Sequence, residues 1–362
     1  MLLTTRTAVP RPRTRVTGLA LAAALTVVLA SCSSPDPEPA AAGGSASPSD
    51  DASATAAAAQ PTSYPLTLDN CGVPVTIEAA PETVLTIKSS TTEMLLALGL
   101  VDTIAATAFP DGPVADWLAD AAATNPAVAT PLSEKAPGPE AVTEVEPDLV
   151  YAGWESNLTA ESAGDRGTLA TLGVATYVSP SACKEAAYQP NPLTFDDVFA
   201  EITEVGTIFD AADAAAELVA DQRAELAAIT PDDRGLTALW YSSGSDIPYV
   251  GAGIGAPQMI MDAAGLTNIA AGIADTWGPF GWEEVIAADP DVIVLVDSAW
   301  GSTEKKIAQL ESNPATANLT AVQDKSYVVV PFPATEAGVR NVSAAADIVA
   351  QLAALPLTPA AG

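Results

Sequence analysis

The sequence predicts an α/β protein in which a single long helix joins two lobes. Short apolar or β-branched runs alternate with segments of helical spacing over residues 63–193, and this alternation returns over residues 235–356. Between them, residues 194–230 are rich in Ala, Glu and Asp and almost free of Pro, which favours one long helix, with a break near Gly206 as the alternative. Because strands that alternate with helices form parallel, helix-covered sheets, each outer region is expected to be a Rossmann-like αβ lobe on this backbone helix.

Residues 1–31 have the organisation of an export signal. An apolar run over residues 19–30 follows a basic segment and is too short to span a bilayer comfortably. The basic residues are Arg6, Arg11, Arg13 and Arg15. The run ends in Leu29-Ala30-Ser31-Cys32, which resembles the lipobox of bacterial lipoprotein signals. This resemblance implies lipidation of Cys32 and cleavage before it, and the alternative is a plain secretory signal with a chance cysteine.

Residues 32–62 consist mainly of Ser, Pro, Ala, Asp and Gly. They show no apolar periodicity, so they are expected to form a disordered tether. An acylated Cys32 would hold this tether firmly, because several acyl chains anchor a protein where one chain does not. The sequence therefore predicts an exported protein, lipid-anchored to the outer face of the cell membrane, with the anchor as its membrane contact.

Composition excludes several classes of function. Without residues 1–31 the chain has ten basic and 45 acidic residues, a net charge of −35, which disfavours nucleic acid and anionic membrane surfaces as partners. The chain has no His, which excludes a Ser-His-Asp triad, a Cys-His pair and His-ligated zinc. No metal site and no cofactor are expected, and the protein is predicted not to be an enzyme.

Two cysteines remain beside Cys32. In an oxidising compartment an even pair suggests a disulfide, here between Cys71 and Cys183. Two unrelated thiols are the alternative, because spacing alone does not establish contact.

The first lobe is expected to contain an edge hairpin and a parallel sheet. Residues 66–77 alternate around an Asn70-Cys71-Gly72 turn, which predicts the hairpin. A β-branched run, a polar loop and a helical pattern that stops at Gly99 follow over residues 83–98 and predict strand, loop and helix. Further strands are expected at 103–108, 147–151 and 174–178, with a helix at 168–172.

The second lobe repeats the alternation of strands and helices. Residues 291–296 form an unbroken apolar run after Asp291, typical of a strand buried on both faces. Strands are expected at 236–241, 291–296 and 326–331, and helices at 257–264, 282–288, 305–310 and 339–355.

Several short phrases occur in a specific order along residues 81–352. They lie at 80–86 running into 92–99, at 146–150, 172–174 and 262–268, and at 288–293, which reads Ala-Asp-Pro-Asp-Val-Ile. In this order they resemble the helical-backbone, class III substrate-binding proteins of ABC importers, those for ferric siderophores, haem and cobalamin. The resemblance implies a protein that captures a solute between its lobes and delivers it to a permease with an ATPase subunit.

A second set of phrases resembles one subgroup of this class more narrowly. They lie at 88–90, 151–157, 181–184, 240–244 and 249–255. They are similar to an actinobacterial subgroup proposed to import a deazaflavin coenzyme precursor, the phospholactate form without its glutamate tail (F-420-0). The resemblance implies an anionic, partly aromatic ligand.

Candidate binding residues follow from the rule that open αβ sheets bind ligands at the carboxyl ends of their strands. The loops expected there contain Lys88, Ser89, Ser90, Trp154, Glu155, Lys184, Tyr241, Ser242 and Trp300, and Tyr249 and Trp277 are added as aromatic residues near predicted loops. Trp and Tyr offer flat stacking surfaces for an aromatic heterocycle. Core packing is the alternative for the aromatic residues, and it is strongest for Trp240, which lies within a strand.

The few basic residues indicate an anionic ligand. Lys88, Lys184 and Arg340 lie at strand ends or at the start of the last helix, and Lys135 lies in a loop expected to face the cleft. Arg340 is suited to clamp a carboxylate or phosphate with two parallel hydrogen bonds. Ordinary surface salt bridges are the alternative. The glycines over residues 251–255 suit either a turn or an anion at a helix N-terminus, and the turn is favoured.

Three classes of function are compatible with the sequence. The favoured one is a monomeric solute-binding lipoprotein, with acidic residues such as Glu161, Asp165 and Glu304 docking to the permease. A carboxylate-dependent lipoprotein hydrolase is a second, supported only by the abundance of acids and lacking a Gly-x-Ser-x-Gly elbow. A receptor or sensor that has kept the fold without its transporter is the third.

Overall fold

The computed structural model describes residues 60–357. The expected signal segment, Cys32 and almost all of the expected tether lie outside the described residues. Among the described residues, no helix has both the length and the apolar character needed to cross a membrane.

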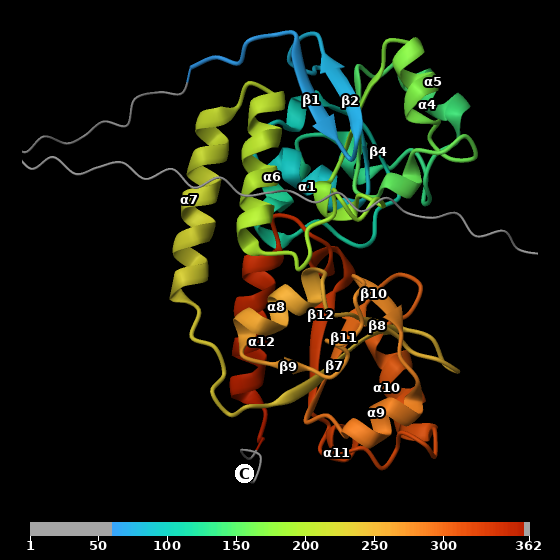
Figure 1. Cartoon of the computed structure of the whole chain (residues 1–362), viewed down its shortest axis with the longest axis vertical. Helices are drawn as coiled ribbons and strands as arrows, with labels where there is room; N and C mark the ends of the chain where they lie inside the picture. Colours follow the sequence, from blue (N-terminus) through green and yellow to red (C-terminus); the bar gives the residue numbers. More distant parts are fainter. Residues whose placement is uncertain (1–59, 358–362) are drawn as a thin grey trace, which may run out of the picture. The chain divides into compact units, whose positions relative to one another are not determined.

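The N-terminal lobe begins with the expected hairpin and continues into a parallel sheet (Figure 1). Strands β1 (Leu66–Asn70) and β2 (Val73–Ile77) pair antiparallel. The sheet has the order β4-β3-β5-β6 and all its neighbouring pairs are parallel. Its strands are β3 (Val84–Ile87), β4 (Ile104–Ala108), β5 (Leu149–Ala152) and β6 (Ala175–Val178). Every residue of β3 and β5 is buried, as expected for central strands covered on both faces.

Short helices connect these strands. They are α1 (Ser89–Ala97), α2 (Ala119–Ala122), α3 (Pro126–Ala129), α4 (Pro139–Val145) and α5 (Arg166–Thr171). Turns of 3₁₀ helix occupy Val101–Thr103, Asp116–Leu118, Glu155–Asn157 and Pro180–Ala182. Most of the polar segment that the sequence predicts as a loop before this helix belongs to it, because α1 begins at Ser89.

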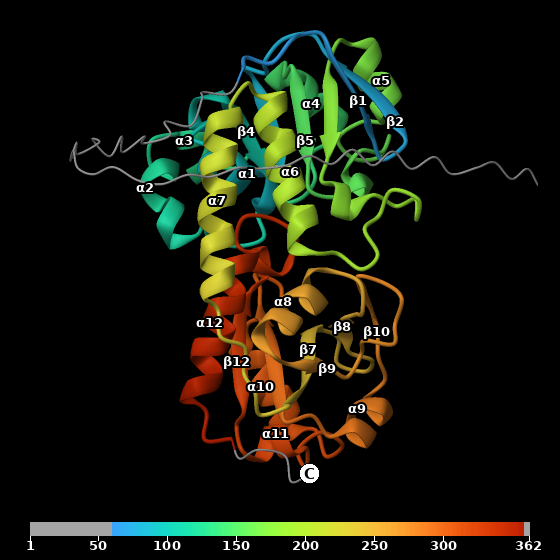
Figure 2. The ribbon, with the colours of Figure 1, turned by 60° about the vertical axis from the view of Figure 1, so that its left-hand side comes forward.

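The backbone segment is not one unbroken helix over residues 194–230: it is interrupted close to Gly206, the alternative that the sequence left open. It forms α6 (Phe195–Ile208) and α7 (Ala212–Ala228), which turn back on each other at Phe209–Ala211 and lie side by side in Figures 1 and 2. The turn uses Asp210 at φ 52°, in the left-handed region that ends helices. The crossing between the lobes is therefore made by α7 alone.

Gly206 explains how closely the two helices of this hairpin approach. A Cβ atom on Gly206 would lie 2.4 Å from the Cβ of Ala215, so a side chain here would force the two helices apart. Composition favours helix throughout this segment, so the break comes from tertiary packing of the two apolar faces rather than from local propensity.

The C-terminal lobe contains a mixed sheet. Its order is β10-β8-β7-β11-β12, with β9 also paired to β7. Strands β7 (Thr237–Ser243), β11 (Val292–Asp297) and β12 (Tyr327–Pro331) are parallel neighbours and were expected. The short strands β8 (Tyr249–Gly251), β9 (Thr267–Asn268) and β10 (Trp277–Pro279) were not expected. With only two or three residues each, these strands are too short to show the alternation of apolar and polar residues by which strands are predicted.

Helices cover this sheet. They are α8 (Ala256–Ala264), α9 (Trp282–Ala288), α10 (Thr303–Ser312), α11 (Thr320–Gln323) and the closing α12 (Asn341–Ala354), preceded by a 3₁₀ turn at Phe332–Thr335. Hydrogen bonds also join the C-terminal lobe to α7 and to the N-terminal lobe. Gln222 of α7 donates to the carbonyl of Val339 at 2.8 Å, and the N–H of Leu193 donates to the carbonyl of Ile254 at 2.9 Å. The predicted α/β class with two lobes is confirmed.

Candidate ligand-binding cleft

A cleft of about 760 Å³ lies between the two lobes and is lined by both. Parallel strands of both sheets end at it, as the strand-end rule predicts. From the N-terminal lobe its lining includes Ser90, Gly153–Ser156, Ser181–Lys184, Gln189, Pro190 and Leu193. From the C-terminal lobe it includes Ser242, Ser243, Tyr249, Ile254–Ala256, Ala274–Trp277, Trp300, Phe332 and Thr335–Ala337.

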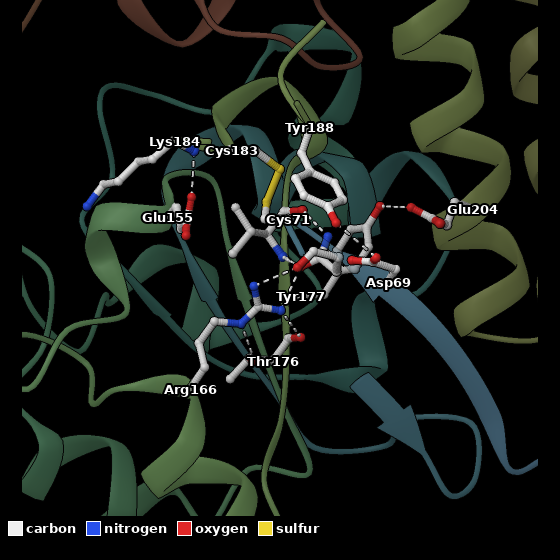
Figure 3. The surroundings of a disulfide bond; sticks show 12 residues. Asp69, Cys71, Glu155, Arg166, Thr176, Tyr177, Cys183, Lys184, Tyr188 and Glu204 are labelled. Carbon is white, nitrogen blue, oxygen red and sulfur yellow. Dashed lines mark hydrogen bonds between the residues drawn. A yellow bond between two sulfur atoms is a disulfide. The ribbon is translucent and has the colours of Figure 1, made fainter. Parts of the chain in front are cut away.

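Two loops of the N-terminal lobe form one rim of the cleft. Glu155 follows β5 and Lys184 follows β6, and the backbone N–H of Lys184 donates to the Glu155 carboxylate at 2.5 Å. Lys184 is exposed, and Figure 3 shows its side chain extending away from the neighbouring disulfide. The hydrogen bond holds the two loops together and leaves the ammonium of Lys184 free to meet a solute.

A disulfide ties this rim to the N-terminal hairpin (Figure 3). It joins Cys71, in the turn between β1 and β2, to Cys183, next to Lys184. Arg166 braces the same turn by donating to the backbone oxygen and the side-chain oxygen of Asn70, at 2.8 Å each. The structure thus bonds the two cysteines that the sequence nominates, and it fixes the position of the rim.

The opposite wall contains four aromatic side chains, those of Tyr249, Trp277, Trp300 and Phe332. Phe332 packs edge-on against Trp300 at 4.6 Å between ring centroids and stacks on Trp277 at 6.3 Å. Trp300 and Tyr249 remain about half exposed, at 51% and 45%. Exposed aromatic rings beside a cleft offer apolar, stackable surface that a solute can cover.

The floor of the cleft holds a buried cluster of charges. The ammonium of Lys88 bonds to Asp111 and lies 3.7 Å from Oε1 of Glu336, so it links the two lobes. It also lies 3.6 Å from the ring centroid of Trp154 and 5.0 Å from that of Phe332, within cation–π range. Lys88 is fully buried, so the expectation that it faces the ligand is wrong: its charge is satisfied inside the protein.

Burial decides the protonation of the acids in this cluster. It raises the pKa of Glu336 to about 8, a rise that Asp111 adds to and Lys88 partly offsets. Burial also raises the pKa of Asp111, although the bonded Lys88 lowers it. Removing a carboxylate from water disfavours its charged form, and a single ammonium cannot compensate two such groups.

The family follows from these features together with one comparison. The sequence profile described as "Periplasmic binding protein" matches residues 84–334, which include both sheets and most of the cleft lining. The chain belongs to this periplasmic binding protein family. Its members bind solutes rather than catalyse reactions, and the family name implies an extracytoplasmic location. No curated protein matches the chain.

Solved structures of this family share the fold. A periplasmic binding protein from Veillonella parvula DSM 2008 is 25% identical with a TM-score of 0.68, over 81% of this chain and 98% of its own. A protein described as an ABC-type Fe3+-hydroxamate transport system, from Saccharomonospora viridis DSM 43017, is 27% identical with a TM-score of 0.68, over 80% and 99%. A periplasmic heme-binding protein from Roseiflexus sp. RS-1 in apo form is 20% identical with a TM-score of 0.58, over 75% and 97%, and shows the fold alone.

Eight of the thirteen nominated binding residues lie on the cleft of this binding protein. They are Ser90, Trp154, Glu155, Lys184, Ser242, Tyr249, Trp277 and Trp300. Six of them were nominated by the strand-end rule, whereas Tyr249 and Trp277 were nominated as aromatic residues near loops and each begins a short strand.

Arg340 is the clearest correction. Its guanidinium is buried and holds the carboxylate of Glu93 through Nε and Nη2, while Nη2 also donates to the carbonyl of Pro113 at 2.6 Å. The expected bidentate clamp therefore exists, but the carboxylate that it holds belongs to α1 of the same chain. The reason is the fold: the start of α12 packs against the N-terminal lobe rather than facing the cleft.

Three further nominations are also corrected. Ser89 is buried and its hydroxyl accepts from the N–H of Asp111 at 2.9 Å. Tyr241 is buried, with its hydroxyl donating to the carbonyl of Gly244 at 2.7 Å. Lys135 is exposed and lies away from the cleft lining. Lys88 and Arg340 are paired with acids inside the protein. Among the described residues that line the cleft, Lys184 is the only basic one, so the expectation of a cationic cleft is wrong.

Sequence reasoning missed Phe332 and Glu336, which follow β12. The strand-end rule applies to them equally, since β12 was expected to end at Pro331. The glycines near residue 253 were expected in a turn, and the structure packs them tightly: a Cβ on Gly253 would lie 2.1 Å from the carbonyl oxygen of Ala271. Among residues 60–357, no group of three or more Cys, Asp or Glu side chains is arranged to hold a metal ion.

Proposed function

We propose that the protein is the solute-binding subunit of an ABC importer and that it captures a bulky, neutral or cationic, partly apolar solute in this cleft. The observation that carries the proposal is the aromatic lining contributed by both lobes, by Trp154 on one side and Trp277, Trp300 and Phe332 on the other. A volume of about 760 Å³ falls within the roughly 300–1,000 Å³ typical of sites for small-molecule ligands.

The charges of the cleft favour a solute that is not an anion. The ionisable acids and bases of the lining are Glu155, Lys184, Asp275 and Glu336, and even with the buried Glu336 protonated the two remaining acids outnumber the one base. The chain without its signal carries a net charge of −35, so the field around it repels anions and attracts cations. A ferric trihydroxamate fits these conditions, because three hydroxamates balance Fe³⁺ and leave a neutral chelate, or a cationic one if an amine is attached.

Such a chelate brings its own iron ligands, so the cleft does not have to supply any. Haem fits less well. A haem iron is held by His, Cys, Met or Tyr, and of these residue types the cleft lining contains only Tyr249 and Cys183, which is bonded to Cys71. The similarity to the Saccharomonospora protein, described as part of an Fe3+-hydroxamate transport system, supports the same solute class.

The deazaflavin precursor implied by the narrower resemblance is the second candidate. Flat rings on Trp277 and Trp300 would suit its tricyclic ring. Its phosphate and carboxylate, however, would meet Lys184 and three acids. Glu161, Asp165 and Glu304, expected to dock to the permease, are all exposed, and this role stays a prediction.

Quenching of tryptophan fluorescence tests the proposal. The purified protein is titrated with ferrioxamine B, hemin and a deazaflavin phosphate, and ferrioxamine B is expected to bind most tightly. Trp300→Ala should weaken that binding about tenfold, because a half-exposed indole contributes about 1–2 kcal/mol to capture.

Trp117→Ala is the matched control, since Trp117 is equally exposed, at 52%, and lies outside the cleft lining. Tightest binding of the deazaflavin phosphate would establish the second candidate instead. Binding of none of the three solutes would contradict both.

A further inference from the structure

Glu336 is the one acid of the cleft floor that lacks a full set of partners. It belongs to the C-terminal lobe, lines the cleft and is only 9% exposed. Its Oε1 lies 3.7 Å from the ammonium of Lys88, whereas its Oε2 is buried and has no hydrogen-bond partner. A buried polar atom without a partner costs about 1–3 kcal/mol, so such atoms are rare unless a further group completes them.

The charges around Glu336 do not balance by themselves. Lys88 brings one positive charge, while Asp111 and Glu336 bring two carboxylates from different segments. Asp111 has the better partners, the ammonium of Lys88 and the N–H of Ser89 at 3.4 Å. Asp111 therefore keeps the negative charge, and Glu336, whose pKa burial raises to about 8, carries a proton at neutral pH.

Among residues 60–357, no other positive charge is positioned to replace that proton. The groups that face Glu336 are Lys88, Asp111 and the indole of Trp154. Arg340, four residues further along the chain, is committed to Glu93 and Pro113. Glu336 lines the cleft, so the side from which a completing group can reach it is the one that a solute occupies.

We propose that Glu336 is the recognition point for a cationic group of the solute, an ammonium or a guanidinium, and that Glu336 loses its proton to solvent when that group binds. The inference rests on the proposed function and refines it by naming the chemistry read at one residue. Proton loss exchanges one charge for another, so the buried cluster stays neutral as a whole while the solute cation gains a carboxylate partner. The faces of Trp154 and Phe332 beside the cluster stabilise a cation further.

Proton release gives the inference a direct readout. Affinity for a cationic solute should rise about tenfold per pH unit below pH 8 and level off above it, because each bound solute displaces one proton. A neutral solute should bind without this dependence.

Isothermal titration calorimetry at pH 7 tests it, in phosphate and in Tris, whose ionisation enthalpies differ widely. The probes are ferrioxamine B, which has a free ammonium, and its N-acetyl derivative, which is neutral and otherwise alike. We expect release of close to one proton with ferrioxamine B and none with the derivative, and about tenfold or more weaker binding of the derivative. Glu336→Gln should abolish both the proton release and the preference.

Glu283→Gln is the matched control, since Glu283 is an exposed acid of α9 away from the cleft. It should leave both readouts unchanged. Equal binding of the two chelates without proton release would overturn the role of Glu336 and leave the proposed function intact. Binding of neither chelate would remove the proposed function, and this inference with it. If Glu336→Gln fails to fold, the proton release that the unaltered protein shows with ferrioxamine B and with its N-acetyl derivative still tests the proposal.

Discussion

Replacing Arg340 with Ala should destabilise the fold and leave ligand capture nearly unchanged. The substitution removes the guanidinium from a carboxylate that is only 1% exposed, and it leaves Glu93 with the N–H of Ala115, at 3.0 Å, as its remaining hydrogen-bond donor. The carbonyl of Pro113 loses a donor as well. Removing one partner of a buried ion pair costs about 3–5 kcal/mol, since the other charge stays buried without compensation.

Urea unfolding followed by circular dichroism measures this effect. The free energy of unfolding should fall by about 3–5 kcal/mol for Arg340→Ala. Arg223→Ala is the surface control: its bond to Asp196 joins side chains that are 54% and 76% exposed, and such pairs contribute at most about 1 kcal/mol. The double variant Arg340→Met, Glu93→Leu should recover much of the loss, because it leaves no unpaired charge.

Two results would refute this reasoning. One is a loss of stability no larger than that of Arg223→Ala, which would mean that the pair is hydrated or readily replaced. The other is unchanged stability with a large loss of ligand affinity, which would return Arg340 to the cleft. Affinity is measured by the same fluorescence titration, at urea-free conditions where both variants are folded.

Two further predictions concern the helical hairpin. Glu201 is buried and accepts a hydrogen bond from the hydroxyl of Tyr151. Burial raises the pKa of Glu201 from 4.5 to about 7, so the folded state favours the protonated form. This preference stabilises the fold by about 3 kcal/mol at low pH, and the stabilisation is lost as the pH rises from 4.5 to 7. Glu201→Gln should flatten the stability–pH curve in this window, whereas Glu217→Gln on the exposed face of α7 should not; equal curves for all three proteins would disprove the assignment. Gly206→Leu should lower the free energy of unfolding by about 1–3 kcal/mol, because the helices meet at this glycine. Ala227→Leu, at an exposed position of α7, is the control and should change the free energy of unfolding little in the same urea measurement. If Gly206→Leu has as small an effect, the two helices can separate without loss of stability.

The sequence was a good guide to strands and a poorer one to what interrupts helices. The long buried strands, such as β11, carry an unmistakable apolar run, and the Asn70-Cys71-Gly72 turn marks its hairpin. The break at Asp210 has a weaker signal: Gly206 allows an interruption nearby, but Ala and Glu favour helix on both sides of it. What decides it is the packing of α6 on α7, which appears only once the chain has folded.

The binding residues also fall into those that local sequence patterns predict and those that depend on contacts distant in the sequence. Loops at strand ends could be found by pattern, so Trp154, Ser242 and Trp300 were placed on the cleft correctly. Where a basic side chain lies depends on which acidic residue it pairs with, and that residue can be far away in the sequence. Arg340 meets Glu93, 247 residues earlier, and Lys88 meets both Asp111 and Glu336. Spacing along the chain carries no information on such pairings.

The bond between Cys71 and Cys183 closes a covalent ring around the whole four-stranded sheet of the N-terminal lobe, because β3 to β6 all lie between these two residues. The C-terminal lobe and the helical hairpin lie outside the ring. One cut by an extracellular protease in an exposed loop inside the ring, for example near Lys135, would open it without releasing a fragment. A cut after residue 183 would separate two pieces unless they stay packed together. After one proteolytic cut between Cys71 and Cys183, the two parts of the N-terminal lobe therefore stay joined by the disulfide.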